Sequence, residues 1–129
     1  MSPDFTRLTR RPTPDELLAQ LCELVPGFGP AWRDSLFIGD DGSFTVHGVF
    51  SEFSSYVHDH FAELDADTWT KLFRYVERCV ATDIHSEAGV SNGACTCFLE
   101  NIAGEGALSH AVSPYLGPES RNYFDQWNG

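Results

Sequence analysis

The stretch Thr45–Leu64 reads TVHGVFSEFSSYVHDHFAEL, and this stretch decides the fold. Its apolar residues recur at steps of three and four, which at about 100° per residue places most of them on one stripe of a helix. The acids Glu52, Asp59 and Glu63 follow one another at spacings of seven and four and form a second stripe, roughly opposite the first. The stretch therefore predicts a helix with one buried face and one negatively charged face. The apolar stripe consists of Val46, Val49, Phe50, Phe53, Val57, Phe61 and Leu64.

The segments on either side of this helix also have helical patterns. Residues 13–25 begin with Thr13, Pro14 and Glu16, the arrangement of a capping box with proline at the first helical position. Residues 68–82 repeat the three-and-four spacing, and Asp67 is the expected N-cap. Because only a short turn joins residues 68–82 to the organising helix, we expect the two helices to pack antiparallel.

Shorter segments complete the predicted architecture. A short helix from Pro30, a helix over 94–103 that stops at Gly104, and helices over 107–112 and 118–127 follow from the apolar spacing and from the glycine and proline positions. A β-hairpin near 36–45, around Asp40-Asp41-Gly42, remains an open alternative. The sequence predicts an all-α domain of about six helices in antiparallel pairs, either a bundle or a short irregular HEAT-like solenoid. The predicted boundaries are a loose arm over 1–12 and one helical domain over 13–129, with an irregular segment at 83–93.

The chain has 129 residues, 42% of them hydrophobic and 13% aromatic, which is typical of one packed domain rather than a disordered chain. It has no apolar run long enough to span a bilayer. Its N-terminus lacks the apolar segment of a signal peptide, so we expect a cytoplasmic protein. The cysteines Cys22, Cys79, Cys95 and Cys97 are then expected to be free thiols rather than two disulfides.

Charge is the strongest signal in the composition. The net charge is −11, and all of it lies in residues 34–129, which contain fifteen acids and four bases. Residues 34–70 contain eight acids and no lysine or arginine. Such a surface disfavours nucleic acid and anionic membranes as partners, and it favours a basic protein, because complementary fields accelerate encounter. The alternative is that the acidity serves only solubility.

No pattern in the sequence points to catalysis, a cofactor or a metal. The pairs His58/His60 and Cys95/Cys97 are each two residues apart, so on a helix their side chains diverge instead of chelating one ion. Two other kinds of catalytic site were considered. One is a dyad of the Cys97 thiol with a histidine, and the other is a pair of acidic side chains. Neither has a supporting motif. We therefore predict no catalytic residue, no cofactor and no metal. The histidines considered as partners of Cys97 in such a dyad are His85 and His110.

Two motifs in the C-terminal third suggest a relationship. Residues 96–101 read TCFLEN and residues 115–121 read YLGPESR. They resemble a family of small, functionally uncharacterised bacterial proteins that share a T-C-F-L-E-N segment and a later Y-L-G-P-x-S segment, over about residues 68–128. Several small acidic proteins of this kind look like immunity proteins encoded beside bacterial toxins. The Glu100-Asn101 pair is expected either to lie on an exposed helix side or to fix the backbone near 115–118.

The hypothesis that combines charge and resemblance is a non-enzymatic immunity protein, an inhibitor that occludes a basic bacterial toxin domain. The alternatives are a small helical scaffold or adaptor that self-associates, and an enzyme using Cys97 or a carboxylate pair. The oligomeric state stays open. The predicted partner-binding residues are acids of the organising helix and the preceding turn, with one aromatic for buried contact: Asp40, Asp41, Glu52, Tyr56, Asp59 and Glu63.

Overall fold

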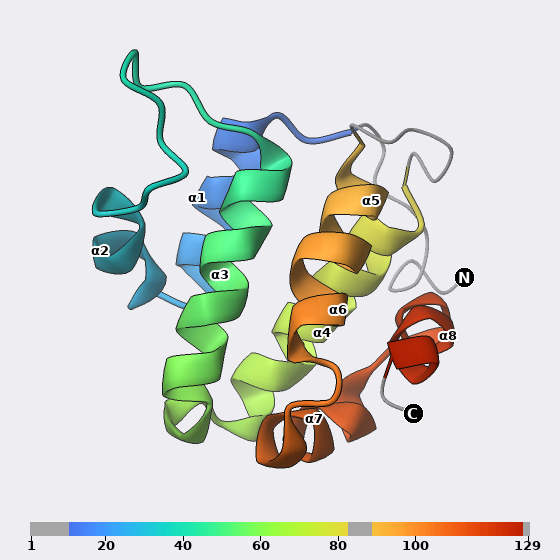
Figure 1. The fold of residues 1–129 in the computed structure, drawn as a ribbon. Helices are drawn as coiled ribbons and strands as arrows, with labels where there is room; N and C mark the ends of the chain where they lie inside the picture. Colours follow the sequence, from blue (N-terminus) through green and yellow to red (C-terminus); the bar gives the residue numbers. More distant parts are fainter. Residues whose placement is uncertain (1–10, 83–88, 128–129) are drawn as a thin grey trace.

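A computed structural model describes residues 11–82 and 89–127, and over these residues the secondary structure is helical throughout, without a strand. This confirms the predicted all-α class. Figure 1 shows the helices gathered around one core, with α3 running along its front. In chain order the elements are α1 (Pro14–Leu24), α2 (Phe28–Arg33), α3 (Val46–His60), η2 (Phe61–Glu63), α4 (Ala66–Val80), α5 (Val90–Gly93), η3 (Ala94–Leu99), α6 (Glu100–Ile102), α7 (Gly106–Val112), η4 (Ser113–Tyr115) and α8 (Pro118–Trp127).

The predicted helix starts at 13 and 45 are confirmed. The Thr13 hydroxyl accepts the Glu16 N–H at 3.1 Å, and the Glu16 carboxylate accepts the Thr13 N–H at 2.9 Å, which completes the capping box of α1. The Thr45 hydroxyl accepts the Gly48 N–H at 3.0 Å and caps α3. The apolar stripe of α3 is buried as predicted from Val46 to Val57. The helix was predicted to reach Leu64 but ends at His60, and Phe61 and Leu64 lie beyond it, half-buried.

The cap predicted for the helix after α3 is wrong by two residues. Asp65, not Asp67, is the N-cap of α4, and its carboxylate accepts the Thr68 N–H at 2.8 Å. Starting the helix at Ala66 puts Asp67 in its positively polarised first turn. In this position Asp67 also pairs with Lys71 at 3.1 Å, a second interaction that favours a helix beginning at Ala66.

The segment between α2 and α3 is a loop, so the alternative of a hairpin near 36–45 is wrong. The N–H of Gly39 donates to the Ser43 carbonyl at 2.8 Å, and the N–H of Gly42 donates to the Gly39 carbonyl at 2.8 Å. This closes one tight turn, with Gly42 at φ 85°, and no ladder continues from it within the described residues. The short helix also begins earlier than predicted, at Phe28 instead of Pro30.

The predicted helix over 94–103 belongs to a longer continuous one, which spans α5, η3 and α6. Its middle part, η3, is a π-helix, in which Glu100 donates its N–H to the Cys95 carbonyl five residues back. By Ala103 the bond to Leu99 spans four residues again. The TCFLEN motif therefore covers a local widening of the helix, a feature that is rare and often found at functional sites.

This helix separates the two that were expected to pack against each other. α3 and α4 run in opposite directions, as predicted (Figure 1). Their aromatic side chains, however, meet through Phe98. The ring of Phe98 lies 5.4 Å from that of Phe53 on α3 and 5.9 Å from that of Phe73 on α4. The predicted direct pairing is therefore replaced by a three-helix arrangement with a fully buried Phe98 between them.

The YLGPESR motif joins α8 to this core through a carboxylate that the sequence did not single out. Glu77 of α4 is only 1% exposed, and its two carboxylate oxygens accept the backbone N–H groups of Glu119 and Ser120 at 3.0 and 2.9 Å. These are free N–H groups of the first turn of α8, so Glu77 caps that helix from another element. Glu100 does not contact residues 115–118 by any hydrogen bond of the described chain; it accepts the Tyr123 hydroxyl at 3.1 Å.

Several predictions fall wholly or partly outside the described residues. These are residues 1–10 of the predicted arm over 1–12, residues 83–88 of the predicted irregular segment over 83–93, and His85. The predicted end of that irregular segment was wrong, because Val90–Gly93 form the helix α5. Among the described residues, no helix is both long enough and apolar enough to cross a membrane. The four cysteines are free thiols, as predicted, although only Cys79 is fully buried.

Candidate functional site

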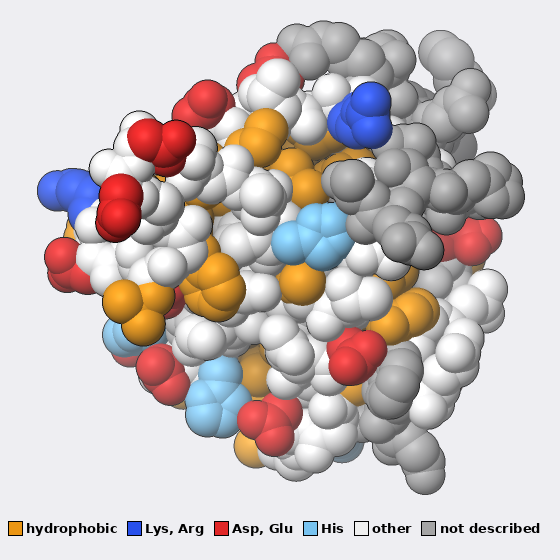
Figure 2. Space-filling model, turned by 45° about the horizontal axis from the view of Figure 1, so that its top comes forward, with side chains coloured by type: hydrophobic (Ala, Val, Ile, Leu, Met, Phe, Trp, Pro, Cys, Tyr) orange, Lys and Arg blue, Asp and Glu red, His pale blue; other side chains and the backbone are white. Residues whose placement is uncertain are grey.

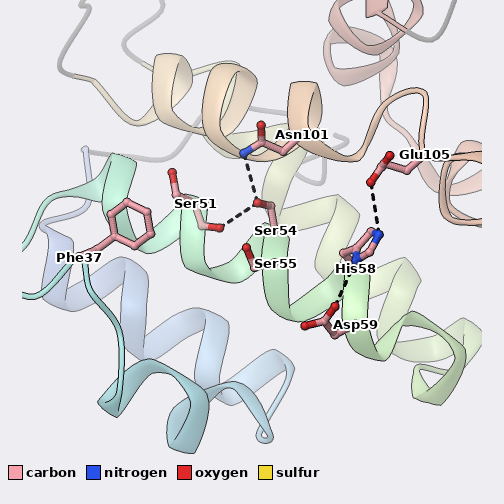
Figure 3. Close-up of a pocket in the computed structure, with 8 residues that line it drawn as sticks. All are labelled: Phe37, Ser51, Ser54, Ser55, His58, Asp59, Asn101 and Glu105. Atoms are coloured by element: carbon pink, nitrogen blue, oxygen red, sulfur yellow. Dashed lines mark hydrogen bonds and ion pairs between the residues drawn. The ribbon is translucent and has the colours of Figure 1, made fainter.

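A groove of about 490 Å³ runs along the outer side of α3. One wall is α3 itself, and the other is formed by the end of the 90–102 helix and the residues that follow it. Phe37, from the loop before α3, closes one end (Figure 3). The groove therefore unites three segments that are far apart in the sequence. Its lining residues are Phe37, Ser51, Ser54, Ser55, His58, Asp59, Asn101 and Glu105.

A hydrogen-bonded pair fixes the floor of the groove. The Ser54 hydroxyl is buried, donates to the Ser51 carbonyl at 2.8 Å and accepts from the Asn101 side-chain nitrogen at 3.2 Å. The same Asn101 nitrogen donates to the Cys97 carbonyl at 2.7 Å, within the π-helical turn. The two walls are thus held at a defined separation, which preorganises the groove.

At the far end of the groove, His58 lies between two carboxylates. Its Nδ1 is 3.1 Å from Asp59 and its Nε2 is 3.3 Å from Glu105 (Figure 3). The groups are more than 40% exposed, so water screens these interactions. Two carboxylates facing one imidazole give this end of the groove an excess of acceptors over donors.

The groove does not have the arrangement of a serine hydrolase, despite its three serines and histidine. A catalytic histidine needs one ring nitrogen toward the serine hydroxyl and the other toward an orienting acid. Here both ring nitrogens of His58 face acids, so neither is directed at Ser54 or Ser55. Over residues 11–82 and 89–127, no three His, Cys, Asp or Glu side chains are grouped so as to hold a metal ion.

The predicted partner-binding residues lie along α3 and the loop before it. Asp40 and Asp41 are exposed at the tip of that loop, Asp59 lines the groove, and Glu63 lies in the turn after α3. Glu52 is half-buried on α3. The structure thus places these acids on neighbouring elements, and only Asp59 is among the groove-lining residues.

Tyr56, the aromatic expected to contact a partner, is half-buried within this chain. Its ring stacks on His60 at 4.3 Å and meets the edge of Phe28 at 5.9 Å. A methyl group on Gly27 would lie 2.2 Å from the Tyr56 hydroxyl oxygen, so α2 approaches closely there. The Tyr56 ring therefore packs mainly against residues of its own chain.

The exposed apolar side chains of this region were missed by the sequence analysis. Leu36 is 98% exposed and Phe37 is 48% exposed, in the loop that also carries Asp40 and Asp41. In Figure 2, exposed hydrophobic side chains lie close to several acidic ones along the left edge of the molecule. The apolar triplet Leu36-Phe37-Ile38 follows the end of a helix and lacks helical spacing, and this could have indicated an exposed loop. It was interpreted instead as a possible strand.

The loop tip is shaped by one of its acids. The Asp41 carboxylate accepts the Ser43 hydroxyl at 2.7 Å and the Ser43 N–H at 3.0 Å. The hydroxyl, more than the backbone N–H, holds the pKa of Asp41 below its usual range. Asp41 is therefore ionised at neutral pH, and it also supports the turn between Gly39 and Ser43.

Three of the four cysteines do not have the surroundings of reactive thiols. Burial raises the pKa of Cys79 to about 12 and that of Cys95 to about 11, and it also raises the pKa of Cys22. A thiol with a raised pKa is a poor nucleophile at neutral pH, because little of it is thiolate. Cys97, the thiol weighed for catalysis, lies 3.6 Å from the Thr96 hydroxyl.

The chain belongs to the family described as a domain of unknown function, DUF7674, whose model matches residues 18–128. The match includes both C-terminal motifs and extends well beyond the 68–128 region in which the resemblance was recognised. Neither the curated proteins nor the solved structures contain a match to the chain.

Proposed function

We propose that this chain is a non-enzymatic, acidic binding protein, most concretely an immunity protein that inhibits a basic bacterial toxin domain by occluding it. One observation carries the proposal: the loop at 34–45 exposes Leu36 and Phe37 and also carries Asp40 and Asp41, and its Phe37 lines one end of a groove whose other end is lined by Asp59 and Glu105. Apolar anchors whose neighbouring charges are mostly of one sign are typical of an interface for an oppositely charged partner.

The acids and the apolar pair have different tasks in this mechanism. Residues 34–70 contain eight acids and no lysine or arginine, so this part of the chain attracts a basic surface and accelerates encounter. Leu36 and Phe37 then become buried against the partner and slow dissociation. Leu36 is the better anchor, because almost all of its side chain is available for burial.

The groove suits a lysine or arginine side chain of that partner. Within the described part of the chain, the hydroxyls of Ser51 and Ser55 have no hydrogen-bond partner, and they lie one helical turn apart on the same face of α3. A cationic head group near Ser55 would face Asp59 and Glu105, and at the other end the Phe37 ring would contact an apolar group of the same partner. Seven residues of helix separate Ser51 from His58, about 10 Å, so the groove takes more of the partner than one extended side chain.

The proposal is tested by binding kinetics with the protein that this chain retains from cells of its source. Replacing Asp40, Asp41 and Asp59 with asparagine is expected to slow association at least tenfold at low salt and to flatten its salt dependence. Replacing Leu36 and Phe37 with alanine is expected to accelerate dissociation instead. Glu23→Gln, an exposed acid on α1, is the matched control and should leave both rates unchanged. Equal kinetics for all variants would overturn the proposal.

Self-association is the second candidate, and the exposure of Leu36 is the observation that favours it. An apolar side chain that is 98% exposed could instead be covered by a second copy of the chain. Sedimentation of the isolated protein at rising concentration separates the two. A dimer that Leu36→Ala dissociates supports a scaffold, and a monomer at all concentrations supports the inhibitor.

A further inference from the structure

Three of the eight basic residues of this acidic chain lie on one helix, α4. Residues 34–129 contain only four bases, and three of them are Lys71, Arg74 and Arg78 of α4. Their spacing of three and four places them on one stripe. The fourth, Arg121, donates to the Ser113 carbonyl at 2.5 Å and so has an internal role. Within the described residues, α4 thus carries a stripe of three bases, with Asp67 beside Lys71 and Glu16 acting on the neighbouring Tyr75.

This stripe borders a pocket between α1 and α4. The pocket has a volume of about 330 Å³, near the lower end of the range for small-molecule sites. α1 contributes the side-chain amide of Gln20 and the apolar Leu24, and α4 contributes the three bases together with Tyr75. The amide and the three cationic side chains supply hydrogen-bond donors from two helices.

Arg74 has an interaction within this chain, so Lys71 and Arg78 are the cations of the pocket that are available to a ligand. Lys71 pairs with Asp67 at 3.1 Å, but both side chains are more than 60% exposed, so this surface pair is weak and open to exchange. For Arg78, no ion pair forms within the described residues, and its buried Nε has no acceptor there. One donor of Arg78, its buried Nε, is therefore left without an acceptor by this chain.

Tyr75 adds no negative charge to these surroundings. Burial, more than any other influence, raises the pKa of its hydroxyl well above the usual range. The phenol is therefore neutral at physiological pH, and its half-buried ring forms an uncharged wall beside the cations.

We propose that this pocket binds a small molecule through a phosphate group. Phosphate is dianionic near neutral pH, and three positive side chains within two helical turns match that charge better than they match a single carboxylate. The planar guanidinium of Arg78 offers paired N–H donors to two oxygens, and Lys71 and Arg74 add charge at the rim. This inference is independent of the acidic surface and of the proposed inhibitor function.

The test is a titration followed by backbone amide NMR spectra, with inorganic phosphate as the probe and sodium chloride keeping the ionic strength constant. Saturable shifts are expected at Gln20 and at residues 71–78. Glycerol phosphate should bind at least as tightly, and acetate at least tenfold more weakly. Shifts that never saturate, or equal affinity for acetate and phosphate, would overturn the proposal.

Variants assign the effect to the pocket. Arg78→Gln is expected to weaken phosphate binding about tenfold, the loss of one charged hydrogen-bonding group. Lys71→Gln, at an exposed position that does not threaten folding, is expected to weaken it about threefold. Arg33→Gln, an exposed base on α2, is the control and should bind as the parent does. If Lys71→Gln and Arg78→Gln both bind like the control, phosphate is bound elsewhere and the assignment fails.

Discussion

Glu77 is the residue on which the C-terminal part of the structure depends most. It is buried, and its carboxylate is the acceptor for two backbone N–H groups of α8. Sequence analysis passed over it, because a glutamate between Val76 and Arg78 resembles an ordinary surface residue of a helix. Its role follows only when α8 is brought against α4, a contact between segments more than forty residues apart.

Glu77→Ala is expected to lower the free energy of unfolding by about 3 kcal/mol, because two buried N–H groups lose their acceptor and a cavity is left. Glu77→Gln keeps one acceptor oxygen and is expected to cost about half as much. Urea denaturation at neutral pH measures both. Glu23→Ala, an exposed glutamate on α1, is the control and should stay within about 0.5 kcal/mol of the parent. A Glu77→Ala protein as stable as that control would contradict this account of Glu77.

The glycine of the YLGPESR motif, Gly117, is required by its close approach to the Glu77 side chain. A methyl group placed on it would lie 2.6 Å from Cγ, Cδ and Oε1 of Glu77, closer than non-bonded atoms approach. Gly117→Ala is therefore expected to destabilise the protein by about 2 kcal/mol. In the Glu77→Ala background the same substitution should cost much less, because the clashing side chain is gone. A double-mutant cycle tests this coupling, and strictly additive effects would disprove it.

At the scale of elements, sequence reasoning found most helices and misplaced some of their ends. Capping at Thr13 and Thr45 was predictable because a hydroxyl directly preceded a clear apolar pattern. Asp65 and Asp67 were both possible N-caps of α4. The helix begins after Asp65, which places the negative charge of Asp67 in the first turn, where it also pairs with Lys71. The π-helix at Ala94–Leu99 had no signal in the apolar spacing, because Phe98, Leu99 and Ile102 face inward as they would in a regular helix.

The cap of α4 predicts a specific pH dependence. The hydrogen bond from the Thr68 N–H is the largest influence that lowers the pKa of Asp65 below 3.8. A carboxylate whose pKa is lower in the folded chain stabilises it at pH values above the unfolded pKa, and this contribution disappears as the pH falls through the folded pKa. Asp65→Ala should therefore lower the melting temperature at pH 6 and have a progressively smaller effect below pH 3.8. Thermal denaturation at several pH values checks this, and an effect that grows in acid would contradict it.

At the scale of the whole molecule, the class of the fold was predictable and the site was not. Helical spacing alone gave an all-α chain. The groove required three separate segments, contributing Phe37, residues 51–59 and residues 101–105, to meet along α3. Their meeting depends on the 90–102 helix lying between α3 and α4, which no local pattern encodes. The exposure of Leu36 was not predictable either. The apolar triplet 36–38 is typical of a buried strand, and only the structure shows that the core is filled without Leu36.

The central claim is that an acidic surface around an exposed apolar pair binds a basic protein. The most direct measurement compares two immobilised baits in extracts of the source organism, the parent chain and a variant with Asp40, Asp41 and Asp59 changed to asparagine and Leu36 to alanine. The account predicts that the parent retains one basic protein, released within a narrow range of rising salt, and that the variant does not retain it. Retention of the same proteins by both baits, or of proteins without excess positive charge, would contradict the claim.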